Sequence, residues 1–242
     1  ARYFEDRKER VTAPRTMGGA ALLTLVPALL VVRQPDLGTA LILLAVGVSL
    51  MLLVGVRLRV LVPVGVGLLA LAPIVWTFLK AYQKRRLLVF LNPNLDPLGA
   101  GYHVAQSKIA VGSGELFGKG FMAASQSQLN FLPENHTDFI FAVLAEQWGF
   151  VGSLAVLALF YFLIIRGLEI SMEAKDLFGS LMAFGITTMI GLQALLNIGM
   201  VLGVMPVVGI PLPLLSYGGS SMVMTLAAIG LLVNVRMRRF MY

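Results

Sequence analysis

Long apolar stretches separated by shorter polar ones dominate this sequence. Six of them approach the roughly 20 residues that a helix needs to cross the hydrocarbon core of a membrane. They are Met17–Val32, Leu37–Val56, Val60–Leu79, Phe139–Ile165, Leu177–Met205 and Leu214–Val235. A longer polar segment, Lys80–Asp138, lies between the third stretch and the fourth. The pattern predicts an all-α integral membrane protein with about six transmembrane helices, forming a single transmembrane domain over residues 1–242.

The composition supports a membrane environment. Of the 242 residues, 58% are hydrophobic and 13% are charged, whereas a soluble domain has roughly 25% charged residues. Between Leu177 and Val235 there is no Asp, Glu, Lys or Arg, and such a run suits hydrocarbon rather than a water-facing surface. The absence of cysteine excludes a disulfide framework and a thiolate metal site.

The positive charges predict the orientation of the spans. The net charge of +7 is explained by Lys and Arg in cytoplasmic loops rather than by binding to nucleic acid. Four basic clusters fall on one side of six spans: Arg2, Arg7, Lys8, Arg10 and Arg15; Arg57 and Arg59; Arg166 and Lys175; and Arg236, Arg238 and Arg239. We assign that side to the cytoplasm. The loop Lys80–Asp138 is then extracytoplasmic although it is basic. Long loops are partly exempt from the charge rule, and an anionic partner at the outer membrane surface is one reason for its charge.

The chain opens at Ala1 with a charged stretch and without a signal-peptide pattern. We interpret this as the end of an earlier helix, so we expect the sequence to be part of a longer protein.

Several short motifs, in a fixed order, resemble the SEDS family (shape, elongation, division and sporulation). They are Gln34–Thr39, Asp96–His103, Gln106–Ala110, Gly118–Gly120, Gln126–Gln128, Phe131–Glu134, His136–Ala142, Asn197–Met200, Pro211–Leu214 and Ser216–Ser220. The stretches Ala100–His103, Phe131–Glu134 and Pro206–Pro211 favour the branch of the family that serves cell elongation. One departure is Glu115, where the family often has glycine. The resemblance implies a SEDS-type helix bundle with a long extracytoplasmic loop.

The resemblance also implies an activity, a location and partners. Members are peptidoglycan glycosyltransferases that polymerise lipid II into glycan strands during cell elongation and cell-shape maintenance. They lie in the bacterial cytoplasmic (inner) membrane, with the active site on the outer face. They work with a class B penicillin-binding protein, whose transpeptidase activity is complementary, and with the elongation machinery.

Asp138 is the candidate catalytic residue. The acceptor 4-hydroxyl attacks the anomeric carbon of the donor, and a lipid diphosphate leaves with inversion. This chemistry needs one general base and cations at the leaving group. The family's proposed catalytic Asp falls on Asp138. The alternative is a helix N-cap, since Asp at the start of a span accepts backbone N–H bonds.

The remaining candidates each have a plainer alternative. Lys108 and Lys119 are candidates for the diphosphate or are solvated loop lysines. His136, Ser107, Gln106 and Ser216 are candidates for substrate binding, although His136 and Ser216 also suit loop structure and helix packing. Glu146, an acid within a span, faces a functional cavity or makes a buried hydrogen bond, for example to Gln193 or Asn197. No cofactor is indicated, and a divalent cation at the diphosphate remains an open alternative without a ligand cluster in the sequence.

Two other functions fit the same composition. A flippase for the lipid-linked precursor needs polar residues through the whole membrane depth, whereas here they gather between Lys80 and Asp138. A non-catalytic scaffold for a transpeptidase has no need of Asp138. Polymerisation of purified precursor separates all three.

Overall fold

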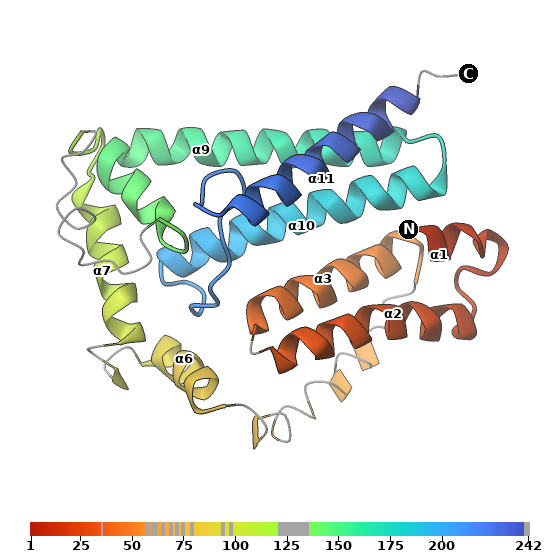
Figure 1. Cartoon of the computed structure of the whole chain (residues 1–242), viewed down its shortest axis with the longest axis horizontal. Coiled ribbons are helices and arrows are strands. Elements are labelled where there is room, and N and C mark those ends of the chain that lie inside the picture. The colour runs from red at the N-terminus through yellow and green to blue at the C-terminus, as the bar shows by residue number, and fades with distance from the viewer. Residues whose placement is uncertain are drawn as a thin grey trace. The chain divides into compact units, whose positions relative to one another are not determined.

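The computed structural model describes residues 1–34, 36–56, 59, 62, 63, 66, 67, 70, 73, 76, 77, 80–92, 95, 96, 99–120 and 136–239. All regular elements in these ranges are helices (Figure 1). The predicted span Val60–Leu79 falls largely outside the described residues, and the motifs Gln126–Gln128 and Phe131–Glu134 lie wholly outside them.

Most predicted spans correspond to helices of suitable length and polarity. The elements are α1 (Arg2–Glu5), η1 (Lys8–Arg10), α2 (Pro14–Arg33), α3 (Leu37–Leu53), α6 (Ala81–Leu91), α7 (Ala100–Ser113), α9 (Ile140–Glu173), α10 (Leu177–Val201) and α11 (Gly219–Arg238). Helices α2, α9, α10 and α11 are long and apolar enough to cross a membrane, whereas α3 has 17 residues. The prediction of an all-α membrane protein is confirmed.

The chain forms two compact units. The first comprises Ala1–Lys84, Arg166–Met189 and Ile229–Tyr242, and the second comprises Arg85–Ile165 and Ile190–Ala228. Helices α9, α10 and α11 each contribute residues to both units, so the boundaries fall within helices and not at a linker. That residues 1–242 form a single domain stays a prediction.

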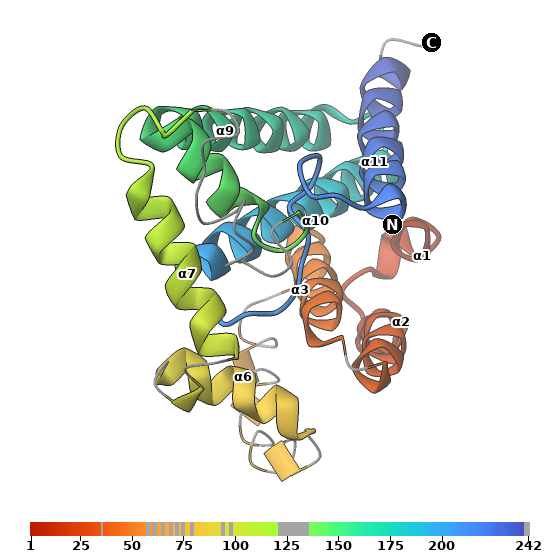
Figure 2. The same ribbon diagram turned by 60° about the vertical axis from the view of Figure 1, so that its left-hand side comes forward.

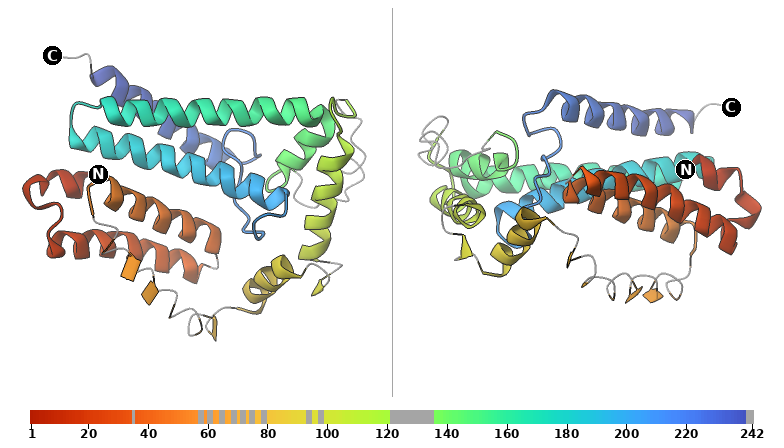
Figure 3. Two further views of the ribbon diagram at one scale, coloured as in Figure 1. Left: turned by 180° about the vertical axis from the view of Figure 1, so that it is seen from behind. Right: turned by 60° about the horizontal axis from the view of Figure 1, so that its bottom comes forward.

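In the first unit, α2 and α3 lie side by side (Figures 1 and 3). Proline at the first position begins α2 and suits a helix N-terminus because its missing N–H is not needed there. Asp36 caps α3 by accepting from the Thr39 N–H at 2.9 Å. The helices approach closely where Gly47 faces Thr24: a Cβ at Gly47 would lie 2.2 Å from Thr24 Cγ2.

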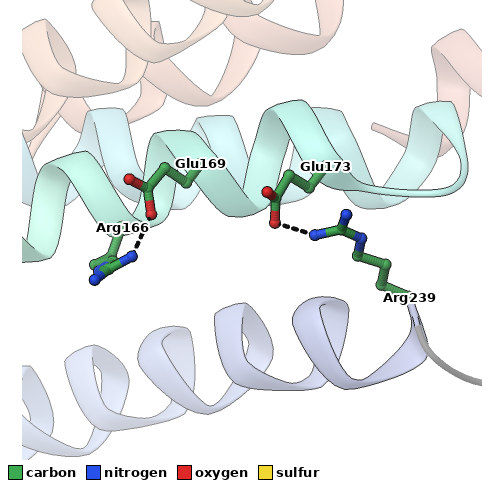
Figure 4. A network of polar contacts seen from close by, with 4 residues as sticks. All are labelled: Arg166, Glu169, Glu173 and Arg239. Carbon is green, nitrogen blue, oxygen red and sulfur yellow. Dashed lines mark hydrogen bonds and ion pairs between the residues drawn. The ribbon is translucent and has the colours of Figure 1, made fainter.

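In the first unit, one ion pair lies within α9 and a second connects the end of α9 to the residue after α11. Glu169 accepts from Arg166 at 2.7 Å, and Glu173 accepts from Arg239 (Figure 4). Two of the basic clusters that we assigned to the cytoplasm, one at the end of α9 and one at the end of α11, therefore lie together. This agrees with the two spans, α10 and α11, between them, because two crossings return the chain to the same side.

In the second unit, α9 is broken at Gly149. This residue has φ 66° and ψ −161°, a conformation that is essentially restricted to glycine. The first turns of α9 bend away from its long remainder (Figure 2). We predicted a continuous span over Phe139–Ile165. Instead, the uninterrupted part runs from Phe150 to Glu173, about 36 Å at 1.5 Å per residue.

The segment Glu115–Gly120 bonds to the backbone groups that this break releases. Phe150 N–H donates to Glu115 O at 2.9 Å and Val151 N–H to Leu116 O at 3.1 Å. In the opposite direction, Lys119 N–H donates to Glu146 O at 3.0 Å and Gly120 N–H to Gln147 O at 3.1 Å. Unpaired backbone polar groups are costly inside a folded protein, so this docking makes the broken helix tolerable.

Gly149→Ala should sharply destabilise the protein. A Cβ there would lie 2.3 Å from Gly118 N and 2.6 Å from Leu116 O, and a non-glycine residue at this φ is strained by about 1–3 kcal/mol before any clash. The matched control is Gly112→Ala in α7, where a Cβ meets nothing within 4 Å. Thermal unfolding in detergent should show a large loss for the first variant and none for the second. Equal melting temperatures would contradict the tight docking of Glu115–Gly120.

Candidate active site

Asp138 lies in a turn that leads into α9. The turn covers His136 to Phe139, and α9 begins at Ile140. Phe139 precedes the helix directly, and its carbonyl accepts from Ala142 N–H at 2.9 Å. Phe139 therefore occupies the N-cap position, and Asp138 comes one residue earlier, partly exposed.

The backbone of this turn is held by residues from the α10–α11 region. Tyr217 N–H donates to His136 O at 2.8 Å, and Ser216 Oγ donates to Thr137 O at 2.6 Å. Asn197 Nδ2, on α10, donates to Asp138 O at 2.8 Å and to Ile210 O at 2.7 Å. Both N–H groups of the Asn197 amide are thus used by these two carbonyls. We had considered Asn197 as a hydrogen-bond partner of Glu146, but its amide donates elsewhere.

The Asp138 carboxylate and the Arg86 guanidinium both lie near Gly209. A Cβ at Gly209 would lie 3.4 Å from Asp138 Oδ2 and 3.9 Å from Arg86 Nη1. The two charged groups therefore flank one backbone position, where glycine has φ +71°. Sequence reasoning assigned Arg86 no role in the site. Its only signal was membership of the basic loop.

Lys108 lies near Arg86. The two side chains line one small cavity of about 40 Å³ together with Val104, Gly203 and Pro206. Gly203 (φ +69°) ends α10 with paired bonds, from Gly203 N–H to Met200 O and from Val204 N–H to Gly199 O, which form a Schellman motif. A Cβ at Gly203 would lie 2.0 Å from Lys108 Cε, so glycine also makes room for the lysine.

Lys119, the other lysine predicted to meet the diphosphate, contacts a protein carboxylate. Its Nζ lies 2.9 Å from Oε1 of Glu146, whose side chain is fully buried. Lys119 is itself 30% exposed. The pair lies at the docked segment beside the α9 break, and a substrate anion would have to share this ammonium with Glu146.

The other candidates are spread across the second unit. Ser107 is fully buried, and its hydroxyl lies 2.9 Å from Val201 O and 3.0 Å from Val104 O, so it joins α7 to the end of α10. Gln106 is half-buried on the same helix. His136 and Ser216 line an open pocket of about 390 Å³ with Tyr217, Gly218 and Gly219. Their contacts with substrate stay predictions.

His103 is a further titratable group of this unit. It lies on α7, with its ring centroid 6.4 Å from that of Phe139. Its Nδ1 is buried and has no hydrogen-bond partner among the described residues. Burial lowers the pKa of His103, and the charge of Asp96 opposes that shift. The lowered pKa favours the neutral imidazole, which suits a role in packing or hydrogen bonding.

The arrangement provides a carboxylate at a fixed turn, the Arg86 guanidinium near the same glycine, Lys108 in one cavity with Arg86, and an open pocket lined by His136 of the turn. These are the components for deprotonating a hydroxyl and stabilising an anionic leaving group. In the described part of the chain, no three His, Asp or Glu side chains gather as a metal site would require.

Fold and site together define a multi-pass helical membrane protein with a candidate general base at a helix entrance. The sequence pattern of the family described as "Cell cycle protein" (FtsW, RodA and SpoVE) matches residues 1–240. The chain belongs to this family.

Named relatives agree with this assignment. The peptidoglycan glycosyltransferase MrdB of Escherichia coli K12 is 48% identical over 228 residues, covering 94% of this chain and 62% of the relative. Stage V sporulation protein E of Bacillus subtilis is 42% identical, with 97% and 64% covered. The chain thus spans a little under two thirds of these relatives' length.

Solved structures are also similar. A structure described as a peptidoglycan synthase complex that coordinates polymerisation and crosslinking has a TM-score of 0.76 at 36% identity, covering 96% of this chain and 65% of that one. The crystal structure of the rod shape determining protein RodA from Thermus thermophilus has a TM-score of 0.62 at 32% identity, covering 93% and 57%. These similarities support the described helical fold.

Lys119→Met should mainly lower the thermal stability of the protein, with only a small effect on turnover. Removing one partner of a buried ion pair costs about 3–5 kcal/mol, and we expect the low end because Lys119 is partly exposed. Replacing both partners, in Lys119→Met/Glu146→Leu, should restore most of the melting temperature because no buried charge is left unpaired. If Lys119→Met instead keeps its melting temperature and loses only turnover, Lys119 serves the substrate as the sequence predicted.

Proposed function

We propose that this protein is a peptidoglycan glycosyltransferase that polymerises lipid II into glycan strands during cell elongation. The observation that carries the proposal is the Asp138 carboxylate, held in the turn before α9 with the Arg86 guanidinium across Gly209. Relatives that share 48% identity carry the same activity in their names. A scaffold would need neither the carboxylate nor the cations.

Asp138 acts as the general base in this proposal. It takes the proton of the acceptor sugar's 4-hydroxyl while that oxygen bonds to the anomeric carbon of the donor. The bond from that carbon to the lipid diphosphate breaks in the same displacement, and the configuration inverts. One carboxylate suffices because no covalent intermediate forms.

The leaving diphosphate requires positive charge. Lys108 and Arg86 suit this role better than Lys119, because they line one cavity while Lys119 is paired with a buried glutamate. A divalent cation at the diphosphate would add to their charge, and we propose it only as an accessory. His136 would contact the sugars from the open pocket.

Location and partners follow from the same reaction. Lipid-linked precursors are polymerised outside the cytoplasm, so we place the protein in the bacterial inner membrane with Asp138 on the outer face. We also propose that it works beside a class B penicillin-binding protein, in line with a structural relative described as part of a peptidoglycan synthase complex. No nucleic acid is involved.

Asp138→Asn should abolish glycan synthesis and keep the fold. Loss of a general base costs about 10²–10⁴ in rate, whereas Asn keeps the side-chain shape and an acceptor oxygen. The measurement is polymerisation of purified lipid-linked disaccharide by the protein made from its whole coding sequence, with folded yield determined on the same preparation. Asp176→Asn, directly before α10 in the first unit, is the matched control and should polymerise normally. A well-folded Asp138→Asn protein with near-normal synthesis would remove Asp138 from the mechanism.

Lys108→Gln and Arg86→Gln should each lower kcat/KM about 10- to 100-fold, because a charge-assisted hydrogen bond contributes about 1.5–3 kcal/mol. Both residues are exposed, so melting temperatures should change little. Lys175→Gln, an exposed lysine of the first unit, provides the comparison. Unchanged kinetics in both test variants would mean that these cations meet only solvent or lipid headgroups.

A further inference from the structure

Three consecutive carbonyl groups before α9 accept hydrogen bonds from one distant stretch of chain. His136 O accepts from Tyr217 N–H, Thr137 O from Ser216 Oγ and Asp138 O from Asn197 Nδ2. The side-chain donors are 79 and 59 residues away in sequence. The turn that carries the candidate base is therefore fixed from outside its own helix.

Helix α9 does not hold these carbonyls itself. The helical ladder begins with Phe139 O, which accepts from Ala142 N–H at 2.9 Å. The carbonyls of residues 136–138 precede that point. The donors from Asn197 and Ser216 act together with the Tyr217 N–H to restrain the turn, so loss of either donor should let its backbone, and the Asp138 side chain with it, change direction.

The two side-chain donors also fix the opposite wall of the site. The second N–H of Asn197 donates to Ile210 O at 2.7 Å, next to Gly209, the residue between Asp138 and Arg86. Ser216 Oγ accepts from Leu212 N–H at 2.7 Å. Each side chain therefore bonds simultaneously to the Asp138 turn and to the loop that faces it.

We propose that Asn197 and Ser216 are positioning residues that set the direction of the Asp138 carboxylate. The inference rests on the proposed function, in which Asp138 is the base. Reacting groups must be held close to their productive geometry, and a displacement of 1 Å costs on the order of 100-fold in rate. Loss of one donor should therefore lower kcat with little effect on KM, because neither side chain need touch the substrate to act.

The test compares two buried serines with the same kind of bond. Ser216 and Ser171 are both at least 96% buried, and each hydroxyl donates to a backbone carbonyl, Thr137 O and Ser180 O respectively. Ser171 belongs to the first unit, away from Asp138 in the chain. Ser216→Ala and Ser171→Ala should lose similar amounts of thermal stability. Only Ser216→Ala should lower kcat, by about 10- to 100-fold, with KM within about twofold.

Two further variants keep the result decisive. Ser216→Thr retains a hydroxyl and should recover most of the kcat. Asn197→Ala removes two bonds and should lower kcat per folded molecule at least as much as Ser216→Ala. In an Asp138→Asn background, Ser216→Ala should cause no additional loss of the residual rate, because its effect acts through that carboxylate.

The failures are distinguishable. If Asp138→Asn is inactive but Ser216→Ala and Asn197→Ala keep the parental kcat per folded molecule, the positioning role is wrong and the proposed function stands. If Ser216→Ala raises KM alone, the serine binds substrate directly and positioning is again wrong. If Asp138→Asn polymerises normally, the proposed base is wrong and the positioning role falls with it.

Discussion

Backbone hydrogen bonding at the break in α9 is the constraint on which the second unit depends. Peptide groups removed from water need partners within the protein, and α9 gives up some of its own at Gly149. The chain compensates with the segment Glu115–Gly120, which exchanges four backbone bonds with the two sides of the break. The left-handed glycine and the docked segment are therefore one feature, since either alone would leave buried polar groups unpaired.

This break determines where the candidate base lies. Because the long part of α9 begins at Phe150, the turns before it can follow a different direction and bring Asp138 toward the α10–α11 loop. Asn197 and Ser216 then hold that turn by its carbonyls. An unbroken helix from Phe139 to Glu173 would instead keep Asp138 on the axis of the crossing. The unusual backbone at Gly149 thus has a functional reason as well as a structural cost.

The apolar pattern was enough to predict the helices that it dominates. The beginnings of α3 and α10 agree with Leu37 and Leu177, and the other ends differ by one to five residues, except that α9 ends eight residues after Ile165. The break in α9 could not be predicted. Glycines are common in membrane helices, and the sequence around Gly149 does not indicate that the segment Glu115–Gly120 docks there. The continuation of α9 to Glu173 was missed because charged residues such as Arg166 and Glu169 read as loop, although they pair three residues apart on one helix face.

The site was predictable in its residue types but not in its pairings. Asp138 came from the family resemblance, and its place before α9 agrees with the predicted start of a span. The spatial neighbours within the site could not be predicted. Lys119 and Glu146, which form an ion pair, are 27 residues apart, and Arg86 is further still from its neighbour Gly209 in the sequence. The sequence does not distinguish one basic residue of this loop from another, whereas the fold gives each a different environment.

The different roles of these basic residues follow from electrostatics. Glu146 has no exposed surface, and a buried carboxylate is tolerable only with a cation beside it. Lys119 supplies that cation, so its charge is largely neutralised by the protein. Arg86 and Lys108 line one small cavity together, and both side chains are exposed, so an incoming anion can reach them. The same loop therefore supplies one lysine that stabilises the fold and two cations suited to a substrate, and the buried carboxylate of Glu146 distinguishes Lys119 from the other two.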